Sequence, residues 1–149
     1  MAQYLDPSVD QASAMMDKDS EQPLAVLNLF KFNDKAAYDA EDPEYGSADA
    51  EISGQEAFAR YSAVAGAYLQ SLGGGVRFSV PVEQVMIGPE GDWDVAAIML
   101  FPTRAAFMRM LSDPEFQTAS RHRKAALANH YMLHLDGTSF FAEEAGETA

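Results

Sequence analysis

The order of the apolar segments along the chain constrains its fold more than any other feature. Leu24–Phe32 (LAVLNLFKF) is short, apolar and bounded by Pro23 and Asn33-Asp34, which is typical of a buried strand. Three later segments have the same character, with alternating or near-continuous apolar residues. They span residues 76–87, 93–101 and 130–135. The sequence therefore predicts four strands.

Helical patterns lie between these strands. Residues 53–56 (Ser-Gly-Gln-Glu) form a capping box that begins a helix, and residues 73–75, all glycine, end it. The apolar residues of this helix share one face, and they are Phe58, Tyr61, Ala65, Tyr68, Leu69 and Leu72. Pro102-Thr103 begins a second helix, and Asp113-Pro114 begins a third that runs to about residue 128. Asp6-Pro7 predicts a short helix over 7–16.

The resulting order is β-α-β-β-α-β with the second helix broken in two, which is the pattern of the α+β ferredoxin-like fold. It predicts a four-stranded antiparallel sheet with helices on one face. Because the strands are apolar on both sides, we expect a second copy of the same sheet to cover the other face. The expected organisation is an N-terminal helical extension over 1–22, the ferredoxin-like domain over 23–136 and a flexible tail over 137–149.

Composition narrows the classes of function. The chain has 149 residues, enough for one domain, and a formal net charge of −13, which opposes binding to nucleic acids and to anionic membrane surfaces. It contains no cysteine, which excludes disulfides, thiolate metal sites and a cysteine nucleophile. The longest apolar run, Val95–Phe101, is far shorter than the roughly 20 residues that span a bilayer, and the N-terminus does not resemble a secretory signal. These features predict a cytoplasmic protein.

Five stretches resemble a known family when taken in order: LNLFKF, SGQEAFARY, GGGVRF, DWDVAAIMLFPTRAAFMRMLSDPEFQ and HRKAAL. Over residues 24–135 the chain is similar to domain of unknown function 1330, within the dimeric α+β barrel superfamily. The resemblance implies a homodimer whose two sheets face each other and a ligand cavity between sheet and helices. It implies no reaction, since relatives on this scaffold include cofactor-free monooxygenases, lactone isomerases and haem proteins.

Arg123 is the most informative candidate for a site residue. In a helix that begins at Pro114 it lies in an apolar stripe, where its guanidinium needs a partner. One interpretation is an anion clamp for a carboxylate ligand. The other is an internal ion pair, for example with Asp94, or an apolar stem with its charged end in water. His122 lies at the edge of the stripe, either as a general base or as a structural residue.

Four further residues are candidates for ligand binding. Asn28 interrupts the first strand, where its buried amide either orients a substrate carbonyl or is satisfied by the backbone. Trp93 is expected at the start of the third strand, where it either forms the wall of a pocket or belongs to the core. The carboxylates of Asp92 and Asp94, on either side of it, are expected to point the same way on a strand. Tyr61 is expected in the core with its hydroxyl at the edge of a pocket.

The sequence predicts no metal and no cofactor. His130 and His134 share one face of a strand, but they lie about 13 Å apart by the strand rise, too far for one unbent metal site. A haem ligand is a remaining alternative. The glycines at 73–75 follow a helix and precede a strand, the reverse of a dinucleotide-binding loop, and there is no nucleophile elbow.

Two classes of function follow. The first is a non-catalytic dimer. It either binds a small hydrophobic compound between sheet and helices, with a carboxylate as one candidate head group, or is purely structural. The second is a cofactor-independent monooxygenase or isomerase acting on such a compound. Whether the protein is an enzyme is left open by the sequence. The acidic segment 34–50 is expected to be a mobile flap beside the cavity.

Overall fold

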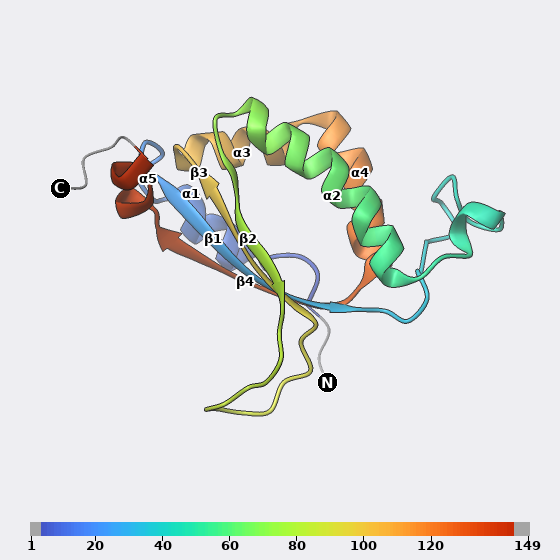
Figure 1. Ribbon diagram of the computed structural model, residues 1–149. Coiled ribbons are helices and arrows are strands. Elements are labelled where there is room, and N and C mark those ends of the chain that lie inside the picture. The colour runs from blue at the N-terminus through green and yellow to red at the C-terminus, as the bar shows by residue number, and fades with distance from the viewer. Residues whose placement is uncertain (1–3, 145–149) are drawn as a thin grey trace.

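A four-stranded sheet forms one layer of the computed structural model, which describes residues 4–144 (Figure 1). Its strands are β1 (Leu24–Phe32), β2 (Gly75–Pro81), β3 (Val95–Phe101) and β4 (Leu127–Asp136), in the spatial order β2-β3-β1-β4. Each neighbouring pair is antiparallel. This is the strand order of the ferredoxin-like fold, and it confirms the predicted α+β class.

Helices α2 (Gly54–Ser71), α3 (Arg104–Ser112) and α4 (Pro114–Ala126) form the second layer, on one face of the sheet (Figure 1). The predicted capping box is present, with the Ser53 hydroxyl and the Glu56 carboxylate each accepting a backbone N–H of the other residue. Asp113 separates α3 from α4, because its carboxylate accepts the N–H groups of Glu115 and Phe116 and so begins a new helix. We call the face of the sheet beneath these helices the inner face, and the opposite one the outer face.

Two short helices lie outside this frame. Helix α1 (Val9–Met16) follows a segment bound to the free edge of β4, where the Tyr4 carbonyl accepts the His130 N–H at 2.9 Å. Helix α5 (Thr138–Glu144) occupies part of the expected tail and was not predicted. The rest of that tail, residues 145–149, lies outside the described residues.

The inner face holds two groups of buried apolar side chains that meet at Phe58. The first lies under α2 and α3 and includes Leu24, Val26, Leu69, Phe101, Phe107 and Phe116. The second lies near α4 and the end of β1 and includes Phe30, Tyr38, Ala57, Ala97, Ala126 and Leu127. The polar groups described below lie where these two groups meet.

The outer face is also apolar, but no helix layer covers it (Figure 1). Strand register places on it Leu27, Leu29, Phe78, Val80, Ile98, Tyr131, Leu133 and Leu135. Exposed fractions of 39% for Phe78 and 40% for Leu133 confirm that these side chains meet solvent.

The connection between β2 and β3 differs from the prediction. Strand β2 was expected to continue to residue 87, but it ends at Pro81. The last backbone hydrogen bond between the two segments runs from the Val82 N–H to the Asp94 carbonyl, at 3.0 Å. Residues 83–93 leave the sheet as a long projecting loop (Figure 1). Proline has no N–H to donate to a strand partner, which favours the end of the ladder here.

Candidate functional site

Three polar side chains on the inner face, Asn28, His130 and Arg123, are linked one to the next by hydrogen bonds. We call them the inner row. Asn28 on β1 is completely buried, and its Oδ1 lies 2.8 Å from Nε2 of His130 on β4. Nδ1 of His130 lies 3.2 Å from Nη1 of Arg123 on α4. A guanidinium can only donate, so Nδ1 accepts from Arg123 and Nε2 carries the proton donated to Asn28. This arrangement fixes His130 as one neutral tautomer.

Burial and the neighbouring positive charge keep His130 neutral. Loss of hydration lowers the pKa of His130 to about 3, and the Arg123 guanidinium acts in the same direction. The imidazole also packs on the Phe30 ring, with 4.8 Å between ring centroids. His130 is therefore a fixed hydrogen-bonding group and not a titrating base near neutral pH.

Two side chains, Asn28 and Tyr61, have N–H or O–H groups that donate no hydrogen bond within residues 4–144. The Asn28 amide nitrogen carries two hydrogens, yet it makes only one long hydrogen bond, 3.4 Å, to the Val26 carbonyl. The Tyr61 hydroxyl on α2 makes no hydrogen bond to any residue in 4–144, although Tyr61 is only 7% exposed. Burial raises the pKa of Tyr61, and the Arg123 guanidinium opposes that shift. The Tyr61 hydroxyl therefore keeps its proton at neutral pH and can donate a hydrogen bond.

Arg123 is held from outside by the N-terminal segment. Its Nη1 donates to the Leu5 carbonyl at 2.6 Å, and its Nη2 contacts the Asp6 carboxylate at 3.2 Å. The internal partner suggested by the sequence, Asp94, is wrong. Asp94 instead accepts the Phe32 N–H at 2.8 Å. Arg123 reaches Asn28 only through His130.

His122 belongs to a second cluster, on a face of α4 about 100° around the helix from Arg123. Its Nδ1 lies 2.7 Å from the Tyr38 hydroxyl, which also accepts from Arg60 at 3.4 Å. Burial lowers the pKa of His122, and Arg121 lowers it further. The Arg121 guanidinium in turn donates two hydrogen bonds to the Glu44 carboxylate, of 2.9 and 2.8 Å.

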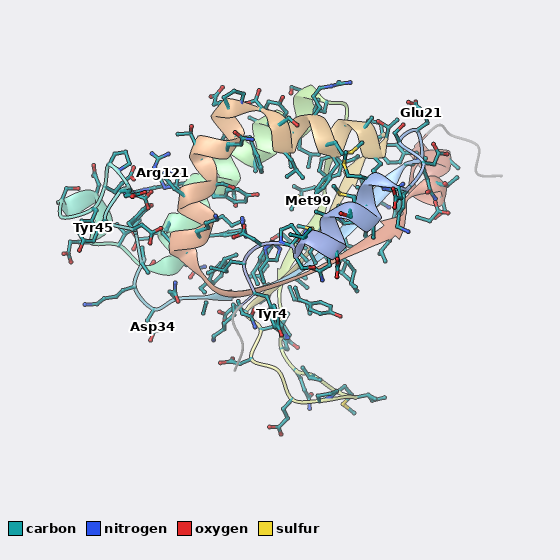
Figure 2. The ribbon with its side chains drawn as sticks, turned by 180° about the vertical axis from the view of Figure 1, so that it is seen from behind. Tyr4, Glu21, Asp34, Tyr45, Met99 and Arg121 are labelled. Carbon is teal, nitrogen blue, oxygen red and sulfur yellow. The ribbon has the colours of Figure 1, made fainter. Side chains whose placement is uncertain are left out.

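These contacts tie the acidic segment 34–50 to α4, and Figure 2 shows Arg121 pointing toward the loop that carries Tyr45. The bidentate Arg121 contact lowers the pKa of Glu44 to about 2. The mobility expected for this segment stays a prediction. Besides Tyr38 and Glu44, the segment is attached through the Ala37 N–H, which donates to the Ala125 carbonyl, and through the Asp49 carbonyl, which accepts from Arg60.

The two remaining candidates, Trp93 and Asp94, lie away from the inner row. Trp93 packs on Tyr131 of the outer face, with 6.4 Å between ring centroids. Asp94 pairs with Lys31 at 3.5 Å. The six candidates therefore separate into different places. Asn28 and Arg123 are linked through His130, and Tyr61 is near enough to Arg123 for the guanidinium charge to act on its hydroxyl.

The sequence patterns did not indicate two residues that the structure places in functionally interesting positions, His130 and Arg104. His130 was weighed only as a metal ligand, although it links Asn28 to Arg123. Arg104 is 4% exposed at the first position of α3 and donates to the Asp19 carbonyl at 2.8 Å. A cation at a helix start, where an acid is favourable, is the sequence signal that points to a special role.

The inner face opens toward solvent at the edge of β4. Met132 pairs directly with Asn28, so its side chain lies on the inner face, and yet it is 42% exposed. Figure 2 shows α1 running alongside this edge.

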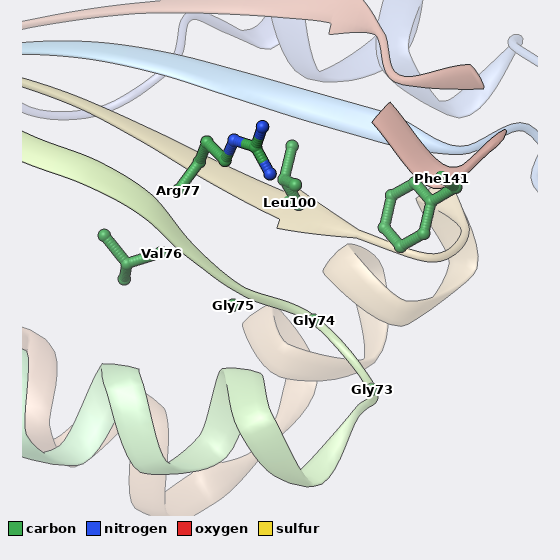
Figure 3. A pocket seen from close by; sticks show the side chains of 7 residues that line it. All are labelled: Gly73, Gly74, Gly75, Val76, Arg77, Leu100 and Phe141. Carbon is green, nitrogen blue, oxygen red and sulfur yellow. The ribbon is translucent and has the colours of Figure 1, made fainter. Parts of the chain in front are cut away.

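Two surface hollows lie elsewhere. One, of about 280 Å³, is lined by the glycines at 73–75 with Val76, Arg77, Leu100 and Phe141 (Figure 3). The other, of about 480 Å³, lies between α4 and the segment 34–50 and includes Asp39, Asp42, Arg121 and Lys124. Neither is lined by Asn28, Tyr61 or His130.

Within residues 4–144, no group of three or more histidine, aspartate or glutamate side chains is arranged to hold a metal ion. Over the same part of the chain, no helix combines the length and apolar character needed to cross a membrane.

Solved structures include proteins of similar fold. A protein of unknown function from Rhodopseudomonas palustris is 32% identical, with a TM-score of 0.78, over 91% of this chain and 97% of that one. A dimeric protein of unknown function with a ferredoxin-like fold, from Bacteroides fragilis, is 11% identical, with a TM-score of 0.40, over 76% of this chain and 95% of that one. SnoaB from Streptomyces nogalater, a cofactor-independent oxygenase, is 17% identical, with a TM-score of 0.39, over 75% and 91%.

Sequence comparison agrees with the strong structural similarity. No curated protein matches the chain. The family described as domain of unknown function DUF1330 matches residues 43–137, most of the ferredoxin-like domain. By this match and by its 32% identity to the Rhodopseudomonas palustris protein, the chain belongs to the DUF1330 family.

Proposed function

We propose that the protein is a homodimer that binds a small hydrophobic compound at the inner face, through a ligand oxygen that accepts from Asn28 and Tyr61. One observation carries this proposal. The completely buried Asn28 amide has an N–H without a partner. An unpaired buried donor costs about 1–3 kcal/mol, so an acceptor supplied by a ligand stabilises the bound state.

Aromatic rings beside these donors favour a planar hydrophobic body for the ligand. Phe58 lies 4.6 Å from Phe30 and 5.6 Å from Tyr61, measured between ring centroids. Phe116 continues the row, 5.9 Å from Tyr61. The positive field of Arg123 favours an oxygen that carries negative charge, such as that of a carboxylate or an enolate.

The same geometry favours binding over catalysis. An isomerase or a cofactor-independent oxygenase acting on such a compound needs a base to remove a proton. Both nitrogens of His130 are engaged, and its pKa of about 3 makes it a weak base. His122 is hydrogen-bonded to Tyr38 in the other cluster. Catalysis stays the alternative, with the unpaired Asn28 and Tyr61 donors stabilising a developing oxyanion.

The proposed dimer rests on the outer face. Its apolar rows span all four strands and include the exposed Phe78, Val80, Leu133 and Leu135. A two-fold axis brings the same patch of two copies together, which removes both from water. The cytoplasm stays the proposed location, as the lack of cysteine suggests.

Fluorescence titration with benzoate, 2-naphthoate and 2-acetonaphthone tests the binding proposal. We expect at least one of them to bind, and Tyr61→Phe to weaken that binding about tenfold by removing one hydrogen bond. Tyr45→Phe is the matched control, since Tyr45 is 58% exposed on the loop, and it should bind like wild type. Failure of all three probes, or equal binding by both variants, would contradict the proposal.

A further inference from the structure

The loop between β2 and β3 projects from the sheet as an arm, which we define as residues 82–94 (Figures 1 and 2). Three consecutive apolar residues lie near its tip: Val85 is 37% exposed, Met86 80% and Ile87 92%. Gly88 follows with a φ of 111°, a conformation that favours glycine and turns the chain back.

An exposed apolar tip of this kind is unfavourable for an isolated chain. Solvent-facing loops normally carry polar turn residues, and adjoining exposed apolar side chains mark an interaction site or an aggregation hazard. The arm otherwise follows the polar rule, with Glu83, Glu90 and Asp92 all exposed. Apart from Val82 and Trp93 at the base of the arm, its large apolar side chains are therefore confined to the tip.

The arm leaves the sheet on the outer-face side, away from the helices (Figure 1). Its base is continuous with the outer face, because Trp93 in the arm packs on Tyr131 of that face. A partner that covers the outer face therefore also lies beside the arm.

We propose that the arm is a clasp that packs Met86 and Ile87 against a second copy of this chain. The inference rests on the homodimer of the proposed function, and it adds a contact outside the two facing sheets. The occupant is a second copy because the outer face and the arm lie on one side of the chain, and two-fold symmetry supplies each copy with the same pair of surfaces. Each arm then reaches past the facing sheets to the flank of the other subunit.

Site-specific photocrosslinking tests this contact, and the lack of cysteine makes the labelling unambiguous. Ile87→Cys is labelled with a benzophenone maleimide and irradiated, with Val9→Cys on α1 as control, because Val9 is 83% exposed on another side of the fold. We expect a covalent dimer from the arm variant, with the label attached to the other subunit's peptides, and none from the control.

Sedimentation of the same samples distinguishes failure of the arm contact from failure of the homodimer. A dimer by sedimentation without an arm crosslink would overturn the clasp and leave the homodimer intact. A monomer at micromolar concentration would overturn the homodimer itself, and the clasp with it.

A charge substitution at the tip gives an independent measure. Met86→Asp with Ile87→Asp should weaken the dimer on the order of 100-fold, since two apolar side chains lose their burial. Val9→Asp with Met16→Asp is the matched control, because both are exposed apolar residues of α1. An unchanged dimer dissociation constant for the arm variant would refute the clasp.

Discussion

Acidification to pH 5 should destabilise the protein through His130. Its pKa is about 3 in the folded state, against 6.5 as the ordinary value in an unfolded chain. Between these values the unfolded state binds more protons, so stability is present above about pH 6.5 and is lost as the pH falls. The slope approaches about 1.4 kcal/mol per pH unit for one group, which gives about 2 kcal/mol between pH 6.5 and 5.

Burial also lowers the pKa values of His122 and His134, so both add to the loss with the same sign. Glu44, with a pKa of about 2, contributes only below about pH 4.5, where its unfolded form takes up a proton. The range from pH 7 to pH 5 therefore isolates the histidines from the carboxylates.

Urea unfolding at pH 7 and pH 5 measures the effect, at one protein concentration because dimerisation contributes to stability. His130→Gln is the matched variant, since glutamine has a donor and an acceptor for Asn28 and Arg123 but does not titrate. We expect its loss of stability on acidification to be smaller than that of wild type by about 2 kcal/mol. An equal loss in both proteins would refute the assignment, as would an NMR titration of His130 with a midpoint near 6.5.

Three further results are expected. Arg123→Met should cost about 3 kcal/mol in urea unfolding, because His130 Nδ1 and the Leu5 carbonyl lose a charged donor, and it should raise the pKa of His130 in an NMR titration. Glu44→Gln should speed hydrogen exchange in residues 39–50 without affecting β1, and equal protection would show that Arg121 does not hold the segment. Leu133→Asp should yield monomers in sedimentation, because it places a charge in the outer face, and a persistent dimer would exclude that face as the interface.

The strands and helices could largely be predicted because their signals are local. Strand β1 has the predicted bounds, since Pro23 and Asn33-Asp34 flank an apolar run, and the Ser53 box begins α2 as expected. Strand β2 ends early, at Pro81, which has no N–H to donate to a strand partner, and apolar periodicity does not reveal where this ladder ends.

The candidate site could be predicted only in part. Asn28 and Arg123 are conspicuous in the sequence as polar residues within apolar patterns, and both belong to the inner row. Their partners depend on tertiary contacts: His130 lies opposite Phe30 by strand register, and Asp6 is 117 positions from Arg123. No local pattern specifies such pairs, which explains why Asp94 was the wrong partner.

The side-chain amide of Asn28 offers the most direct test of the proposed site. Its two N–H signals in ¹⁵N-labelled protein, assigned by their loss in Asn28→Leu, report whether each proton is hydrogen-bonded. We expect one signal to move downfield when 2-naphthoate or 2-acetonaphthone saturates the protein, because the free N–H then donates to the ligand oxygen. Saturation by a probe that leaves both signals in place would contradict binding at the inner face.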